Sequence, residues 1–139
     1  MQGKSFKELS CEEEFFSEMT VTESHLILFA ELIGDFNPVH TDEEYCKETK
    51  FRKRCMHGAF TNSFITAPIG QYFFGTALAL LELNTKFKAP VFPGDTLRAC
   101  WKIETLTKKT NSGLVNLKCE CQNNSGVIVA ISTAKILIK

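Results

Sequence analysis

The chain has 139 residues, 44% of them hydrophobic and 23% charged, which is typical of one globular domain and excludes a disordered segment. Its 16 basic and 16 acidic side chains cancel, so the net charge does not indicate nucleic acid or an anionic membrane as a partner. No apolar run approaches the roughly 20 residues that span a bilayer. The N-terminal stretch resembles neither a signal peptide nor a transit peptide, so we expect one cytoplasmic domain over residues 1–139.

The first elements are predicted to be a strand and a helix. Residues 14–19 alternate weakly between polar and apolar side chains, as an edge strand does. Thr20 and Glu23 have the spacing of a capping box, which predicts that a helix begins there. Its apolar stripe consists of Leu26, Phe29, Ala30 and Ile33. Gly34 is then the residue that ends the helix.

The loop after this helix, residues 34–40, reads Gly-Asp-Phe-Asn-Pro-Val-His and has the most informative chemistry. Pro38 forces Asn37 into an extended or turn conformation, so we predict a non-helical loop. Such a loop brings Asp35 and His40 to one point, where a carboxylate and an imidazole hold a water and transfer protons near neutral pH. The same residues also fit a structural role, as a helix cap, turn residues and a polar approach to the next helix.

A short helix and a basic segment follow the loop. Thr41 and Glu44 have the spacing of a second capping box, which predicts a helix through about residue 46 or 48. Residues 47–54 contain five basic side chains and form a local positive patch in a neutral protein. This patch is either a solvated loop or a site that receives phosphates.

Residues 56–74 are the longest apolar stretch and predict a largely buried helix. Gly58 lies at its expected N-terminus, where unpaired N–H groups and the helix dipole suit a carbonyl oxygen that gathers negative charge. Alternatively, the glycine only permits a tight start of the helix. Pro68 is expected to kink or end the helix, because it lacks the N–H that helical hydrogen bonding requires.

From residue 78 onward the apolar period changes to two, which predicts strands. Turn residues separate four alternating stretches, which cover residues 81–89, 97–105, 115–121 and 127–138. Short turns between consecutive strands indicate an antiparallel meander. We therefore predict the α+β class, with a curved antiparallel sheet wrapped around one central helix.

Six cysteines are present, but their spacing does not suggest a metal site. They include no Cys-x-x-Cys pair, and no histidine has the spacing typical of zinc, so we expect no metal. Cys119 and Cys121 are two residues apart, which places both on one face of a strand. We interpret them as small buried thiols.

Several motifs in this order resemble the MaoC-like dehydratases, also called (R)-specific enoyl-CoA hydratases, of the hot-dog fold. The residues that carry the resemblance are Asp35, Asn37, Pro38 and His40, then Thr41-Asp42, then His57-Gly58, then Phe87-Lys88-x-Pro90-Val91-x-x-Gly94-Asp95. The similarity runs from about residue 20 to the last strand. It implies reversible addition of water to a trans-2-enoyl thioester of coenzyme A or acyl carrier protein, which gives an (R)-3-hydroxyacyl thioester.

The resemblance also implies roles for individual residues. Asp35 and His40 would hold and activate the water, and Asn37 would shape the loop. The N–H of Gly58 would bind the thioester oxygen, and Thr66 takes the place of a serine hydroxyl near the substrate in some relatives. No cofactor is implied beyond the carrier of the acyl group. A homodimer paired through the sheets is implied as well, which would cover an exposed strand edge.

Two features depart from the family pattern, and two other functions remain open. Pro68 in the central helix is unexpected, and the 12 phenylalanines would narrow an acyl tunnel, so chain length is left undetermined. A hot-dog thioesterase would aim its water at the carbonyl carbon instead of the double bond. A non-catalytic module would bind acyl thioesters or a partner without turnover.

Overall fold

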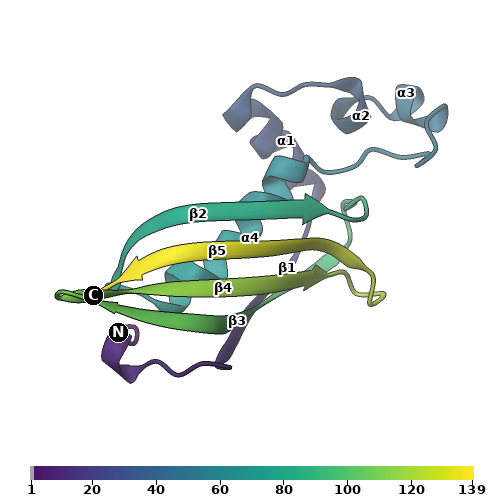
Figure 1. The fold of residues 1–139 in the computed structure, drawn as a ribbon. Helices are drawn as coiled ribbons and strands as arrows, with labels where there is room; N and C mark the ends of the chain where they lie inside the picture. The colour runs from purple at the N-terminus through teal and green to yellow at the C-terminus, as the bar shows by residue number, and fades with distance from the viewer. Residues whose placement is uncertain (1) are drawn as a thin grey trace.

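The computed structural model describes residues 2–139, in which most helices precede most strands (Figure 1). The elements are, in chain order, the 3₁₀ helix η1 (Phe6–Glu8), β1 (Glu14–Thr20), α1 (Glu23–Ile33), α2 (Pro38–Thr41), α3 (Glu43–Lys47), α4 (Gly58–Tyr72), β2 (Ala77–Phe87), β3 (Thr96–Lys109), β4 (Ser112–Gln122) and β5 (Ile128–Ile138). The predicted first strand, central helix and C-terminal strands are thus confirmed. No helix of the described residues has the length and hydropathy of a membrane span.

The strands form one antiparallel sheet in the order β1-β3-β4-β5-β2. β3, β4 and β5 make the predicted meander, but β2 pairs with β5 at the far edge, so the meander prediction is wrong for β2. The chain between β2 and β3 is longer than a tight hairpin turn. It forms backbone hydrogen bonds with other segments, from Met56 N to Val91 O and from Gly94 N to Val21 O, both at 2.7 Å.

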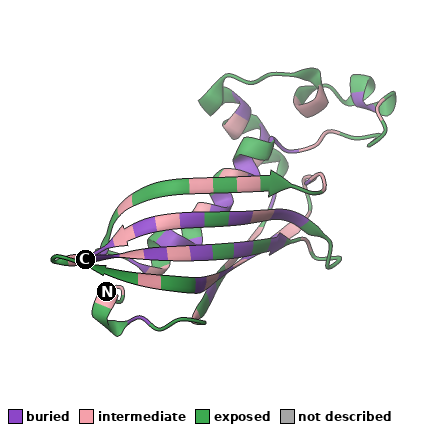
Figure 2. Ribbon diagram, viewed as in Figure 1, coloured by how far each residue is buried: buried purple, intermediate pink, exposed green. Residues whose placement is uncertain are grey.

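Helix α4 packs against one face of this sheet and supplies much of the core (Figures 1 and 2). Alternate side chains of β3, β4 and β5 are buried toward it, as the period of two predicted. The indole N–H of Trp101 in β3 donates to the carbonyl oxygen of Ile65 in α4 at 2.6 Å, and both residues are fully buried. Sheet and helix are therefore joined by a buried polar contact as well as by apolar packing.

Pro68 does not end α4, which continues to Tyr72. A proline removes one helical hydrogen bond, but the Pro68 ring is buried in the core, where packing supports the helix on both sides of it. The contact of Trp101 with Ile65 lies within one turn of this position. Tertiary packing therefore outweighs the local penalty of the proline.

The N-terminal cap of α1 differs from the predicted one. Thr22, not Thr20, caps the helix. Its hydroxyl accepts a hydrogen bond from the amide N–H of His25 at 3.2 Å, and the Nδ1 of His25 accepts one from the amide N–H of Thr22 at 3.1 Å. Thr20 instead belongs to β1, where its hydroxyl pairs with that of Thr96 at 2.8 Å. Gly34 ends the helix as predicted, with a left-handed φ of 74°.

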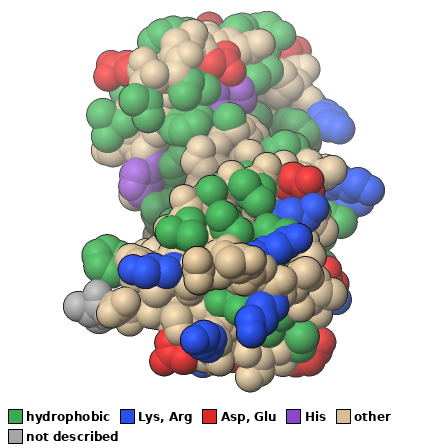
Figure 3. Space-filling model, turned by 60° about the vertical axis from the view of Figure 1, so that its left-hand side comes forward, with side chains coloured by type: hydrophobic (Ala, Val, Ile, Leu, Met, Phe, Trp, Pro, Cys, Tyr) green, Lys and Arg blue, Asp and Glu red, His purple; other side chains and the backbone are tan. Residues whose placement is uncertain are grey.

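Two groups stand out among the large apolar side chains that remain exposed. One group lies on or just after α1 and consists of Ile27, Leu28, Leu32, Ile33 and Phe36. The other lies on the edge strand β2 and consists of Leu78, Leu80, Leu81 and Phe87. Figure 3 shows hydrophobic side chains gathered over the upper part of the molecule, where Figure 1 places α1 to α3. Exposed apolar side chains that gather in groups are characteristic of an interaction site.

Candidate active site

The loop after α1 is built by one asparagine and one proline. Asn37 is extended, with φ −53° and ψ 134°. Its side-chain oxygen accepts a hydrogen bond from the amide N–H of Val39 at 3.2 Å. Pro38 is then the first residue of α2, a position for which its fixed φ is well suited. The predicted non-helical loop is therefore correct up to Asn37 and wrong for Pro38–Thr41, where a capped proline starts a single helical turn that contains His40.

The second predicted cap lies one residue away from its expected position. Asp42, not Thr41, caps α3, and its carboxylate accepts the amide of Tyr45 at 3.0 Å. Thr41 is the last residue of α2, and its hydroxyl donates to the carbonyl oxygen of Phe36 at 3.1 Å. Only Asp42 separates α2 from α3, so His40 lies in the first of two consecutive capped turns.

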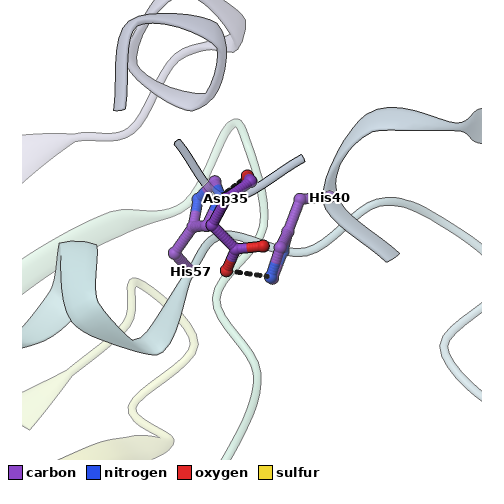
Figure 4. A group of neighbouring side chains, drawn as sticks. All are labelled: Asp35, His40 and His57. Carbon is purple, nitrogen blue, oxygen red and sulfur yellow. Dashed lines mark hydrogen bonds and ion pairs between the residues drawn. The ribbon is translucent and has the colours of Figure 1, made fainter. Parts of the chain in front are cut away.

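Asp35 and His40 meet, as the spacing of the loop predicted (Figure 4). The Nε2 of His40 lies 3.9 Å from the Oδ2 of Asp35, and the two side chains are 13% and 47% exposed. The Nδ1 of His40 lies 2.7 Å from the carbonyl oxygen of Cys55. A carbonyl oxygen only accepts, so Nδ1 carries a proton, and Nε2 is the nitrogen that faces Asp35. The distance of 3.9 Å is too long for a direct hydrogen bond.

His57 is a third member of the group, and the sequence analysis did not identify it as a site residue. It is 2% exposed, and its ring stacks on His40 with 3.9 Å between centroids and 28° between planes. Its Nε2–H donates to the carbonyl oxygen of Asp35 at 2.9 Å (Figure 4). Among the described residues its buried Nδ1 has no hydrogen-bond partner. The available signal was its place directly before Gly58 in the His-Gly motif.

Asp35, His40 and His57 also include the kinds of ligand that bind metals. One potential ligand atom from each lies within 4.8 Å of the others. One nitrogen of each histidine donates to a carbonyl oxygen and so carries a proton, which leaves a single free nitrogen on each neutral ring. The absence of a metal stays a prediction.

Gly58 opens α4 beside a cavity of about 370 Å³ that also reaches His40. As the first helical residue, Gly58 has an amide N–H without a partner inside the helix. The cavity is mostly apolar, and it is lined by His40, Phe51, Cys55, Met56, Gly58, Thr61, Phe87, Lys88, Ala89, Pro90, Val91 and Val129. A helix end with an unpaired amide therefore borders a space that is large enough for part of a ligand.

Thr66 is not brought to this cavity by the fold. It lies two turns further along α4, and its hydroxyl donates to the carbonyl oxygen of Ser63 at 2.7 Å. Its role near the substrate stays a prediction.

A larger hollow of about 650 Å³ lies over the face of the sheet opposite α4 and contains none of the predicted site residues.

The basic segment, residues 47–54, borders the cavity, and one of its cations is committed to ion pairs. The side chain of Arg54 is 15% exposed and forms ion pairs with Glu23 at 2.6 Å and Glu43 at 2.9 Å, so the structure assigns it to joining α1 and α3. In contrast, the ammonium groups of Lys50 and Lys53 lie over the rings of Phe51 and Phe92, at 5.0 and 4.2 Å from the centroids. The rings of Phe51 and Phe92 are neighbours, with 6.1 Å between their centroids. Phe51 also lines the cavity, so both ammonium groups lie near its rim.

Comparison with known proteins identifies relatives over nearly the whole chain. Residues 8–123 match the family model described as MaoC like domain. A Rhodospirillum rubrum protein named (R)-specific enoyl-CoA hydratase is 33% identical over 119 residues, which cover 86% of this chain and 81% of that protein. A Pseudomonas aeruginosa R-hydratase, solved without ligand, has a TM-score of 0.86 at 29% identity and covers 96% of this chain and 84% of its own. An Archaeoglobus structure named monoamine oxidase regulatory protein has a TM-score of 0.90 at 29% identity and covers 99% and 95%.

Proposed function

The chain belongs to the family of MaoC-like domains, as its motifs predicted, and we propose that it catalyses the reversible addition of water to trans-2-enoyl thioesters. The product is an (R)-3-hydroxyacyl thioester, and the enzyme is a hydro-lyase. The antiparallel sheet around α4 is the predicted hot-dog fold. The observation that carries the proposal is the position of the His40 Nε2, which lies 3.9 Å from the Asp35 carboxylate and beside the cavity at the start of α4.

The proposed reaction uses the unprotonated Nε2 of His40 as the base. Asp35 and His40 hold one water, and His40 takes a proton from it while the water oxygen forms a bond to C3 of the enoyl group. The electron pair of the double bond moves through C2 toward the thioester oxygen. This oxygen gathers negative charge and accepts a hydrogen bond from the N–H of Gly58. A proton returned to C2 by the same acid–base pair completes the addition.

Two further residues have supporting roles in this proposal. Asn37 shapes the loop: its side chain caps α2, and its own amide donates to the Oδ1 of Asp35 at 3.1 Å. That second contact orients the Asp35 carboxylate. Thr66 is retained as a substrate contact on the resemblance alone. No cofactor is required, because hydration moves only a proton and a hydroxyl group.

We also propose that two copies of the chain pair through β2. This strand is an edge of the sheet, and its exposed leucines and Phe87 would otherwise face water. Phe87 lies at the cavity, with ring atoms 3.6 Å from the position that a Cβ on Gly58 would occupy. A partner covering β2 would therefore also enclose one wall of the proposed substrate site. The cytoplasmic location and the single-domain organisation stay predictions.

The test of the reaction is incubation of the protein with crotonyl-CoA. Hydration removes the conjugated double bond, so the ultraviolet absorbance of the enoyl thioester falls without release of thiol, and chiral chromatography finds the (R) product. Release of free coenzyme A would indicate a thioesterase instead. Binding of the thioester with neither change would indicate a non-catalytic module, and either result would reject the hydratase.

A further inference from the structure

His57 contacts all three parts of the proposed catalytic group. Its Nε2–H donates to the carbonyl oxygen of Asp35, its ring stacks on that of His40, and its peptide bond leads directly to Gly58. The carboxylate, the base and the oxyanion donor come from the loop after α1, from α2 and from α4. His57 is thus one residue at which three separate segments of the chain meet.

Packing alone does not explain an imidazole at this position. His57 is 2% exposed and lies against Phe29, with 5.3 Å between ring centroids, so its surroundings would suit an apolar ring. A histidine brings a buried Nδ1 that has no hydrogen-bond partner among the described residues, which costs free energy. The one polar contact it makes across the site is the bond from Nε2 to the loop at Asp35.

This bond holds a part of the chain that is otherwise weakly tied down. The residues of the loop from Gly34 to Pro38 are all exposed, and their hydrogen bonds to the rest of the chain are few. Asp35 would shift with the loop, and a displacement of about 1 Å in a catalytic group can lower turnover by about 100-fold. The stacked ring also limits tilting of the His40 imidazole, whose Nδ1 is held by the carbonyl of Cys55.

We propose that His57 is a positioning residue. It holds the Asp35 carboxylate at its distance from the His40 Nε2, and it keeps both groups in place beside the Gly58 amide. It acts through its Nε2–H and through its flat ring, and it does not itself exchange a proton with the substrate. This inference rests on the proposed hydration. It adds a residue whose loss should affect turnover more than binding.

Three variants separate the two contacts of His57. His57→Phe keeps a flat ring but loses the donor, His57→Gln keeps an N–H near the place of Nε2 but loses the ring, and His57→Ala loses both. With crotonyl-CoA we expect kcat to fall by about 10-fold or more for Phe, by about 100-fold for Ala, and by an intermediate amount for Gln. We expect KM to stay within about twofold in all three. His25→Gln, which keeps an acceptor for the Thr22 amide, is the matched control and should turn over like the wild type.

Melting temperatures and circular dichroism identify variants that fail to fold, and kcat is compared only among folded proteins. The proposal is overturned if folded His57→Phe keeps kcat within about threefold of wild type, or if Gln restores nothing relative to Ala. A readout without turnover uses NMR of ring-¹⁵N-labelled histidine. In the wild type His40 should show the Nδ1–H tautomer that the Cys55 carbonyl holds, and in His57→Phe the signal of its Nε2 should shift, because the Asp35 loop that faces Nε2 has lost its donor. Unchanged His40 signals would reject the positioning role even if crotonyl-CoA proved not to be a substrate, so the two failures are distinguishable.

Discussion

The Nδ1–H of His40 donates to the carbonyl oxygen of Cys55 at 2.7 Å, and this bond determines which nitrogen faces Asp35. His40 belongs to α2, whereas Cys55 lies just before α4. The bond therefore connects α2, which supplies the base, to the segment that leads into α4, which supplies the oxyanion donor. It is a backbone contact, so substitution of the Cys55 side chain leaves the acceptor in place.

The first prediction concerns the catalytic pair. Asp35→Asn keeps the shape of the side chain but removes its charge, and His40→Ala removes the base. Because general acid–base catalysis typically contributes 10²- to 10⁴-fold, we expect each variant to lower kcat for crotonyl-CoA by about that factor. Acyl-thioester affinity, measured by calorimetry, should change little. Wild-type kcat in either folded variant would contradict the assignment.

The second prediction concerns the carrier of the acyl group. Lys50 and Lys53 lie over aromatic rings beside the cavity and are placed to meet the phosphates of coenzyme A or the acidic surface of an acyl carrier protein. Charge reversal to glutamate at both positions should raise KM several-fold with kcat nearly unchanged. Lys108→Glu with Lys109→Glu, at the far end of β3, is the control of equal charge change. Equal KM values in the two double variants would show that the basic segment is only a solvated loop.

The third prediction concerns pairing through β2. Leu80 is 49% exposed on this edge strand, so Leu80→Lys should convert a dimer into a monomer, because a buried unpaired ammonium is costly in an interface. Analytical ultracentrifugation measures the mass directly. As a control, Thr107→Lys on β3 adds the same charge at an exposed position away from β2 and should leave the mass unchanged. A wild-type monomer at micromolar concentration would contradict the pairing.

The fourth prediction concerns the buried contact between Trp101 and Ile65. Trp101→Phe removes the indole N–H and leaves the carbonyl oxygen of Ile65 without this donor. The lost hydrogen bond and the smaller ring should together lower the free energy of unfolding by about 2–4 kcal/mol. Because Trp101 is the one tryptophan of the chain, urea unfolding is followed by circular dichroism and not by fluorescence. A loss below about 0.5 kcal/mol would mean that the bond contributes little.

The fifth prediction concerns the thiols. Burial raises the pKa of Cys121 to about 12, and burial raises the pKa of Cys119 further above its ordinary value. Because the thiolate is the reactive form and a raised pKa delays its formation until high pH, both thiols should resist alkylation at pH 8 in the folded protein. Exposed Cys11 should react at once. Mass spectrometry of peptides after brief iodoacetamide treatment measures this, and denaturation should make all six cysteines reactive.

Much of the site could be predicted from the sequence, because Asp35 and His40 lie in one short segment. Asn37 and Pro38 restrict the backbone locally, and this restriction brings Asp35 and His40 near each other, while contacts with His57 and Cys55 hold them in place. The alternation of apolar residues likewise predicted β3, β4 and β5, since each strand presents alternate side chains to the core. Helix α4 was predicted from a long apolar stretch with helical spacing, because a helix that is apolar on several faces must be buried.

Other features were decided only by the tertiary structure. The edge position of β2, the commitment of Arg54 to Glu23 and Glu43, and the role of His57 beside His40 all join residues that are far apart in the chain. The spacing of neighbouring residues sets local conformation, because dihedral preferences and side-chain periodicity act over a few residues. Partners across the fold are selected by the free energy of burying many surfaces at once, which no short segment contains.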